Sequence, residues 1–165
     1  MILIKYGGHA LPEPGKPDEM LRHIAQYHLQ GNKCVLVHGG GPQINHELHL
    51  RNIESEFLDG YRKTTPEVFA VVQKVLSGDV LRTLVNQLIG FGVNAVGLSS
   101  SDGQLIRAKQ MEPISIGQVG EVDSINPFIL ELLLAEGFFP VISPIGVDIH
   151  GNGFNLNADI AAGAI

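Results

Sequence analysis

The sequence contains a single cysteine, Cys34, among its 165 residues, which excludes an internal disulfide framework. Because disulfide-free chains are typical of reducing compartments, we expect a cytoplasmic protein. No apolar run is long enough to cross a membrane, and no basic segment followed by an apolar one opens the chain, so we expect no membrane partner and no secretion signal. Clusters of Lys and Arg are absent, and with a formal net charge of −6 the chain is not expected to bind nucleic acid.

Common nucleotide and metal signatures are missing as well. No Gly-x-x-x-x-Gly-Lys-Ser/Thr run occurs, which excludes a P-loop, and no Gly-x-Gly-x-x-Gly opens a helix after the first predicted strand, which disfavours dinucleotide binding. In His46-Glu47-Leu48-His49 the two histidines stand three positions apart, whereas the zinc-protease motif needs four. We therefore predict a solvated helix face there and no metal ligands.

What the chain does contain is an alternation of strand and helix patterns. Short apolar runs predict strands over 2–5, 34–37, 93–98 and 139–143. Apolar residues at helical spacing predict helices over 17–30, from 42, over 66–90, 128–135 and 160–165. Residues 104–122 have a short, β-like pattern that predicts an antiparallel hairpin laid beside the main sheet. The alternation predicts an α/β fold, a three-layer αβα sandwich with a mainly parallel central sheet plus this β-hairpin.

Glycine-rich turns follow two of the predicted strands. Gly7-Gly8 comes after the first strand, and Gly39-Gly40-Gly41 comes after the second, directly before Pro42 opens a helix. Glycine lets a ligand approach the backbone closely, and a helix start adds partial positive charge. One such turn alone is more often only a turn. Two turns at one sheet edge, with Lys5 beside one of them, favour a site for phosphate or carboxylate chemistry.

Five segments, in this order, resemble motifs of the N-acetyl-L-glutamate kinases, which belong to the amino acid kinase family. They are Lys5-Tyr6-Gly7-Gly8, His38-Gly39-Gly40-Gly41-Pro42, Asp59-Gly60-Tyr61-Arg62, Gly117-Gln118-Val119-Gly120-Glu121-Val122 and Asn155-Leu156-Asn157-Ala158-Asp159. The resemblance implies the amino acid kinase fold. It also implies phosphorylation of the γ-carboxylate of N-acetyl-L-glutamate by ATP with Mg²⁺, in arginine biosynthesis.

The resemblance also implies roles for residues of this sequence. Catalysis would fall to Lys5, which neutralises the transferring phosphoryl group, and to Asp159, which organises the groups around it. The acyl amino acid would be bound by Gly40, Gly41, Arg62 and Asn155. Phosphate or nucleotide would contact Gly7, Gly8 and Gly39. An arginine suits a carboxylate because its planar fork donates two parallel hydrogen bonds, and phosphoryl transfer needs fixed positive charge.

The chain departs from the family pattern in several ways. Family members continue well beyond the point where this chain stops, inside a helix after Asp159. We therefore expect residues 1–165 to form the N-terminal, acyl-amino-acid-binding lobe without the C-terminal nucleotide lobe. Leu81-Arg82 stand where the family often has Asn-Lys. Because the chain begins directly at a strand, it resembles the arginine-insensitive homodimers, and we expect the long helix 66–90 to form much of the dimer contact.

Two alternatives to N-acetyl-L-glutamate phosphorylation stay open at this point. Related kinases that share the glycine turns phosphorylate other carboxylates, such as a carrier-linked aminoadipate or glutamate. The chain by itself could instead be a non-catalytic module that binds the acyl amino acid or dimerises. A substrate screen tests the first alternative, which predicts activity on a carrier-linked analogue and none on N-acetyl-L-glutamate. A phosphorylation assay on the chain tests the second alternative, which predicts no turnover.

Overall fold

Four parallel strands form the central sheet of the computed structural model, which describes residues 1–11, 16 and 18–165. Their order is β1 (Ile2–Tyr6), β2 (Cys34–His38), β8 (Phe139–Ser143) and β5 (Ala95–Ser99). Every neighbouring pair is parallel, and β1 pairs with β2 in register from Ile2 with Cys34 to Tyr6 with His38. The predicted parallel sheet is therefore confirmed.

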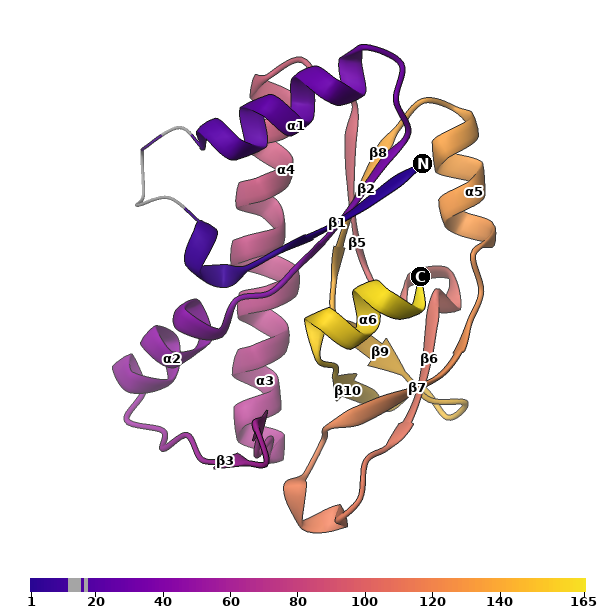
Figure 1. The fold of residues 1–165 in the computed structure, drawn as a ribbon. Coiled ribbons are helices and arrows are strands. Elements are labelled where there is room, and N and C mark those ends of the chain that lie inside the picture. Colours follow the sequence, from indigo (N-terminus) through magenta and orange to yellow (C-terminus); the bar gives the residue numbers. More distant parts are fainter. Residues whose placement is uncertain (12–15, 17) are drawn as a thin grey trace.

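Helices cover both faces of this sheet (Figure 1). One face carries α1 (Glu19–Leu29), α2 (Gly41–Leu50), α3 (Pro66–Lys74) and α4 (Leu81–Gly90), and the other carries α5 (Phe128–Ala135) and α6 (Ala158–Ala164). The side chains of β2 divide between the two cores. Cys34 and Leu36 belong to the core under α1–α4, and Val35 and Val37 belong to the core under α5 and α6. This alternation produces the predicted three layers. The predicted helix start at Pro17 lies outside the described residues.

The long helix predicted over 66–90 is real but not uniform. It consists of α3, a π-helical segment Val75–Val80 and α4. The Thr65 hydroxyl caps its start by accepting a hydrogen bond from the Val68 N–H at 3.3 Å. Its apolar stripe is buried in the chain's own core: Val68, Val71, Val72, Val75, Leu81, Leu84, Val85 and Leu88. The stripe is therefore not available to a second copy, and the homodimer remains a prediction.

The antiparallel hairpin is confirmed as β6 (Ile106–Gln110) and β7 (Gly120–Ile125), but it belongs to a second sheet. That sheet has the order β10-β9-β6-β7, with β9 (Ile145–Val147) and β10 (Gly153–Asn155). The expectation of a hairpin merely laid beside the main sheet was thus incomplete. Sequence patterns did not predict β9 and β10, because each has only three residues and periodicity cannot be recognised over that length.

Short elements complete the described chain. A small hairpin, β3 (Phe57–Leu58) and β4 (Tyr61–Arg62), precedes the long helix, and 3₁₀ turns span Gly8–Ala10, Asp102–Gln104 and Ile114–Ile116. Among the described residues, none of the helices has the length and apolarity needed to cross a membrane. The turns after β1 and β2 lie together at the carboxyl end of the sheet, where the Gly39 N–H donates to the Tyr6 carbonyl at 2.8 Å.

Candidate functional site

A cleft of about 280 Å³ opens at the carboxyl ends of β1 and β2. Most of the residues predicted to form a site line it: Lys5, Gly8, Gly39, Gly40, Gly41, Arg62, Asn155 and Asp159. They come from segments far apart in the sequence, namely β1, the two glycine turns, the β3–β4 hairpin, β10 and α6. The remaining predicted residue, Gly7, is not part of the cleft wall.

The two glycine turns pack directly against each other. A Cβ atom on Gly8 would lie 2.9 Å from the Gly40 Cα, and one on Gly40 would lie 2.7 Å from Leu76 Cδ2. The Gln43 side-chain amide joins the turns by donating to the Gly8 carbonyl at 3.0 Å. Glycine is therefore required at Gly8 and Gly40 for close approach rather than for a left-handed backbone.

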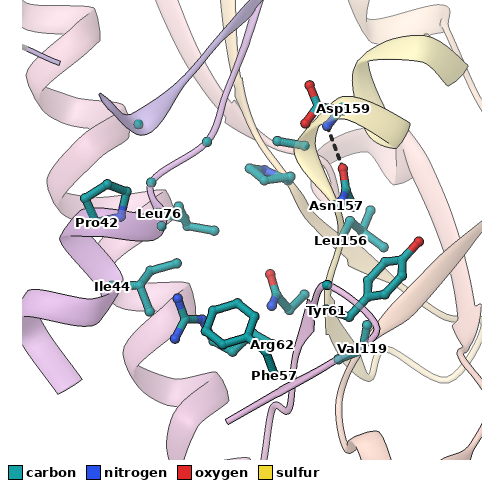
Figure 2. A pocket seen from close by; sticks show the side chains of 18 of the residues that line it. Pro42, Ile44, Phe57, Tyr61, Arg62, Leu76, Val119, Leu156, Asn157 and Asp159 are labelled. Carbon is teal, nitrogen blue, oxygen red and sulfur yellow. Dashed lines mark hydrogen bonds between the residues drawn. The ribbon is translucent and has the colours of Figure 1, made fainter. Parts of the chain in front are cut away.

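Lys5 and Asp159 face each other across the rim of the cleft. Their side chains form an ion pair with 3.0 Å between Nζ and Oδ1, and the Asp159 side chain is 71% exposed. Asp159 is held in the first turn of α6 because the Asn157 side chain caps this helix, accepting from the Asp159 N–H at 2.8 Å (Figure 2). Because this ion pair lies at the exposed rim, the Lys5 ammonium can exchange the Asp159 carboxylate for an anion that enters the cleft.

Arg62 is the buried cation of the site. Its guanidinium donates to the Ser55 hydroxyl and, at 2.7 Å, to the Asn45 side-chain carbonyl, and it stacks on the Phe57 ring at 4.7 Å. All three neighbours are neutral, and no carboxylate pairs with Arg62 within the described part of the chain. Burial lowers the pKa of Arg62 from its ordinary value, although an arginine remains charged at neutral pH. The cleft wall therefore contains a positive charge without an internal counter-ion.

Two hydrogen bonds through the Thr64 hydroxyl connect the Asn155 side chain to the backbone of Arg62. Its side-chain amide donates to the Thr64 hydroxyl at 3.3 Å, and that hydroxyl donates to the Arg62 carbonyl at 2.7 Å. Thr64 is completely buried. This bridge therefore ties the Asn155 side chain to the backbone of β4, the strand that carries Arg62.

Sequence reasoning missed the apolar part of the cleft. Figure 2 shows Pro42, Ile44 and Leu76 on one side of it and Tyr61, Val119 and Leu156 on the other. Leu76 is not among the residues of the predicted apolar stripe. It lies in the π-helical segment, which no sequence pattern marked, and its side chain contacts the glycine turn.

The histidine-containing segment of α2 takes part in surface ion pairs. The Glu47 Oε1 atom lies 2.8 Å from Arg51 Nη2 and 3.0 Å from Lys74 Nζ. These cations lower the pKa of the Glu47 carboxyl, chiefly through its hydrogen bond from Arg51. Within residues 1–11, 16 and 18–165, no group of three or more His, Cys, Asp or Glu side chains is arranged to hold a metal ion.

Comparison with known proteins places this geometry in a family. The model described as the amino acid kinase family matches residues 1–165. The chain belongs to the amino acid kinase family. Among curated relatives, it is 43% identical over 176 residues to an acetylglutamate kinase of Hydrogenovibrio crunogenus, covering 99% of this chain and 59% of the relative. It is 44% identical to one of Geobacillus thermodenitrificans, covering 99% of this chain and 63% of the relative.

Solved structures share the fold of this chain. The smu.665 protein of Streptococcus mutans superimposes with a TM-score of 0.88 at 28% identity, over 98% of this chain and 65% of that one. An N-acetylglutamate synthase of Neisseria gonorrhoeae, solved with coenzyme A and N-acetyl-glutamate, has a TM-score of 0.78 at 20% identity, over 94% of this chain and 36% of that one. The latter likeness shows the fold alone. In every comparison the amino acid kinase chain described here spans only part of its relative's length.

Proposed function

We propose that this chain is the acyl-amino-acid-binding lobe of an enzyme that phosphorylates the γ-carboxylate of N-acetyl-L-glutamate in arginine biosynthesis. The observation that carries the proposal is the buried, uncompensated Arg62 in the same cleft as two glycine turns and Lys5. A dicarboxylate that is to be phosphorylated needs a fixed cation for the carboxylate that is only bound, backbone N–H donors for the carboxylate that reacts, and a cation for the phosphoryl group. The names of the curated relatives support the same substrate.

The substrate end of the cleft is assigned to Arg62, Asn155 and the Gly40-Gly41 turn. The Arg62 guanidinium would bind the α-carboxylate with the N–H groups that Asn45 and Ser55 leave free, while these two neighbours hold it in place. Backbone N–H groups at the start of α2 would hold the carboxylate that reacts, aided by the partial positive charge of that helix end. The apolar walls would accept the acyl group and the methylene chain.

The phosphoryl end is assigned to Lys5, Asp159, Gly8 and Gly39. ATP with Mg²⁺ is the co-substrate that the family implies, and when bound it would supply the transferred phosphoryl group. The residues present fit such a group: the Lys5 ammonium stands at the rim, and the Gly8 and Gly40 backbones approach each other without intervening side chains. Asp159 would hold Lys5 in place until the negative charge arrives.

We extend the proposal to assembly and location. A homodimer through the long helix would have to use its outward face, where Ile89 on α4 is 54% exposed, and not the apolar stripe that is buried in the core. The enzyme would act in the cytoplasm, in keeping with its single, buried and unpaired Cys34.

Calorimetric titration of the purified chain with N-acetyl-L-glutamate tests the proposal. We expect binding by the wild-type chain and loss of binding in Arg62→Ala, with Arg51→Ala as the matched control because Arg51 forms a surface pair with Glu47. The α-amide of N-acetyl-L-glutamate, which lacks the α-carboxylate, should bind as weakly as the variant does. No heat of binding from a folded sample would overturn the assignment and favour a carrier-linked carboxylate. Binding without phosphate transfer from ATP would favour the non-catalytic module.

A further inference from the structure

His38 is a completely buried imidazole directly before the glycine turn, and the proposed chemistry gives it no task. It ends β2, in register with Tyr6 of β1. Its Nδ1 lies 3.0 Å from the Gly39 carbonyl oxygen, whereas its Nε2 has no hydrogen-bond partner among the described residues. A buried polar atom without a partner costs stability, and an apolar side chain of similar size would avoid that cost. The ring is therefore poorly explained by packing alone.

The contact with Gly39 fixes the protonation pattern of the ring. A carbonyl oxygen only accepts, so the Nδ1 atom must carry the proton and donate it. Burial of the ring lowers the pKa of His38 to about 4, so the imidazole is neutral at physiological pH and Nε2 has a bare lone pair. His38 is thus a neutral donor at Nδ1.

This donor holds one of the peptide groups that form the turn. The Gly39 N–H donates to the Tyr6 carbonyl at 2.8 Å, and the Gly39 carbonyl accepts from His38, so both sides of Gly39 are fixed. In a planar trans peptide the N–H points opposite to the C=O. The Gly40 N–H, which shares its peptide group with the Gly39 carbonyl, therefore points away from the imidazole, and Gly40 itself lines the cleft.

We propose that His38 is a positioning residue that holds the Gly39 carbonyl toward its own ring and so keeps the Gly40 N–H group directed at the ligand carboxylate. Three consecutive glycines have no side chains to set their conformation, so the turn needs a hold from outside itself. The identity of the ligand in this inference rests on the proposed function. The hydrogen bond from His38 to Gly39 is independent of that function.

Three variants separate this role from simple packing. His38→Asn can place an N–H near the position of Nδ1, His38→Gln places one near Nε2, and His38→Leu has none. We expect His38→Asn to bind N-acetyl-L-glutamate within about threefold of wild type, and His38→Gln and His38→Leu to bind about tenfold more weakly, the scale of one lost hydrogen bond. Thermal unfolding of each variant shows which samples are folded. A packing role predicts that stability, not affinity, follows the side chain, with His38→Leu the best tolerated.

A second measurement on the wild-type chain needs neither ligand nor variant. The ¹⁵N chemical shifts of the His38 ring, read in an NMR spectrum at neutral pH, distinguish a protonated from a bare ring nitrogen. A proton on Nδ1 alone supports the inference, and a proton on Nε2 or on both nitrogens overturns it. Equal affinity losses in folded His38→Asn and His38→Leu would also overturn it. If the wild-type chain binds no N-acetyl-L-glutamate, the proposed function fails while the ring spectrum still decides the role of His38.

Discussion

Gly8 and Gly40 touch backbone to backbone, since a Cβ on Gly8 would come within 2.9 Å of the Gly40 Cα. We predict that Gly8→Ala forces the two turns apart and lowers the free energy of unfolding by about 1–3 kcal/mol, the usual cost of overpacking. Gly7→Ala is the matched control, because its Cβ would meet only Lys5 Nζ at 3.9 Å and its φ of −71° suits alanine. Urea unfolding of both variants measures the difference. Equal stabilities would show that the turns separate freely.

Gly40 and Leu76 form the second close contact, and it is possible only because glycine has no Cβ atom. A Cβ on Gly40 would lie 2.7 Å from Leu76 Cδ2, the end of a flexible side chain. We predict that Gly40→Ala and Leu76→Ala couple by about 1 kcal/mol in a double-mutant cycle, because the shortened Leu76 makes room for the new methyl. Gly41→Ala is the control, since no atom lies within 4 Å of its Cβ position. Strictly additive unfolding free energies for Gly40 and Leu76 would contradict the contact.

Much of the fold could be predicted from local sequence patterns. The strand Phe139–Ser143 and the helix Phe128–Ala135 have the predicted bounds, because a short, mostly apolar run and a helical run closed by Gly137 are both strong local signals. The second sheet could not be predicted in full. Its strands β9 and β10 are too short for a pattern, and they exist because their backbones pair with each other and because β9 also pairs with β6. The pairing of β9 with β6 joins segments that are distant in the sequence, so no local sequence pattern predicts it.

The polar half of the site was predictable, and the apolar half was not. Lys5, Arg62 and Asn155 stand in recognisable motifs, and the structure brings all three to one cleft. Leu76 lies in the π-helical segment and lines the cleft beside Gly40, a tertiary contact that no local sequence pattern marks. The hydrogen bond from His38 to Gly39 could not be predicted either, since the sequence does not indicate which ring nitrogen of a histidine carries the proton.

Arg62 should control affinity for the acyl amino acid. We predict that Arg62→Ala weakens N-acetyl-L-glutamate binding by about 2–5 kcal/mol, because a buried charge pair loses one partner. Arg62→Lys should recover only part of the loss, since an ammonium cannot donate as a fork. Calorimetric titration compares both with Arg51→Ala, whose surface pair with Glu47 leaves the cleft unchanged. Wild-type affinity in Arg62→Ala would remove Arg62 from the substrate site.

Lys5 should act on the rate and not on substrate affinity. Its pair with Asp159 is largely exposed and so adds little to stability, and its charge is needed where negative charge develops during transfer. We predict that Lys5→Ala keeps both the unfolding free energy and N-acetyl-L-glutamate affinity near wild type. Phosphate transfer by an enzyme with this lobe should fall by at least about tenfold in kcat. Lys109→Ala, which removes a cation from the pair with Glu121 on the second sheet, is the control. A fall in affinity equal to that of Arg62→Ala would contradict the division of roles.

His38 should make the fold sensitive to mild acid. Burial lowers the pKa of His38 from 6.5 to about 4 in the folded chain, so the unfolded chain binds the extra proton first. The stability that depends on the neutral ring is complete above pH 6.5 and is lost as the pH falls towards 4, at up to about 1.4 kcal/mol per pH unit. The carboxyls with lowered pKa values, Glu47, Glu56 and Asp148, add their losses only below their ordinary range near pH 4, so the interval from 6.5 to 5 isolates the histidine.

Urea unfolding at pH 7, 6 and 5 measures this slope. The control is His38→Asn, which cannot titrate in that interval and should show a markedly flatter profile. A wild-type profile as flat as that of His38→Asn would mean that the ring is protonated as easily in the folded chain as in the unfolded one. The imidazole would then have access to water or to an acceptor at Nε2, and a neutral ring donating only from Nδ1 would no longer account for the position of the Gly39 carbonyl.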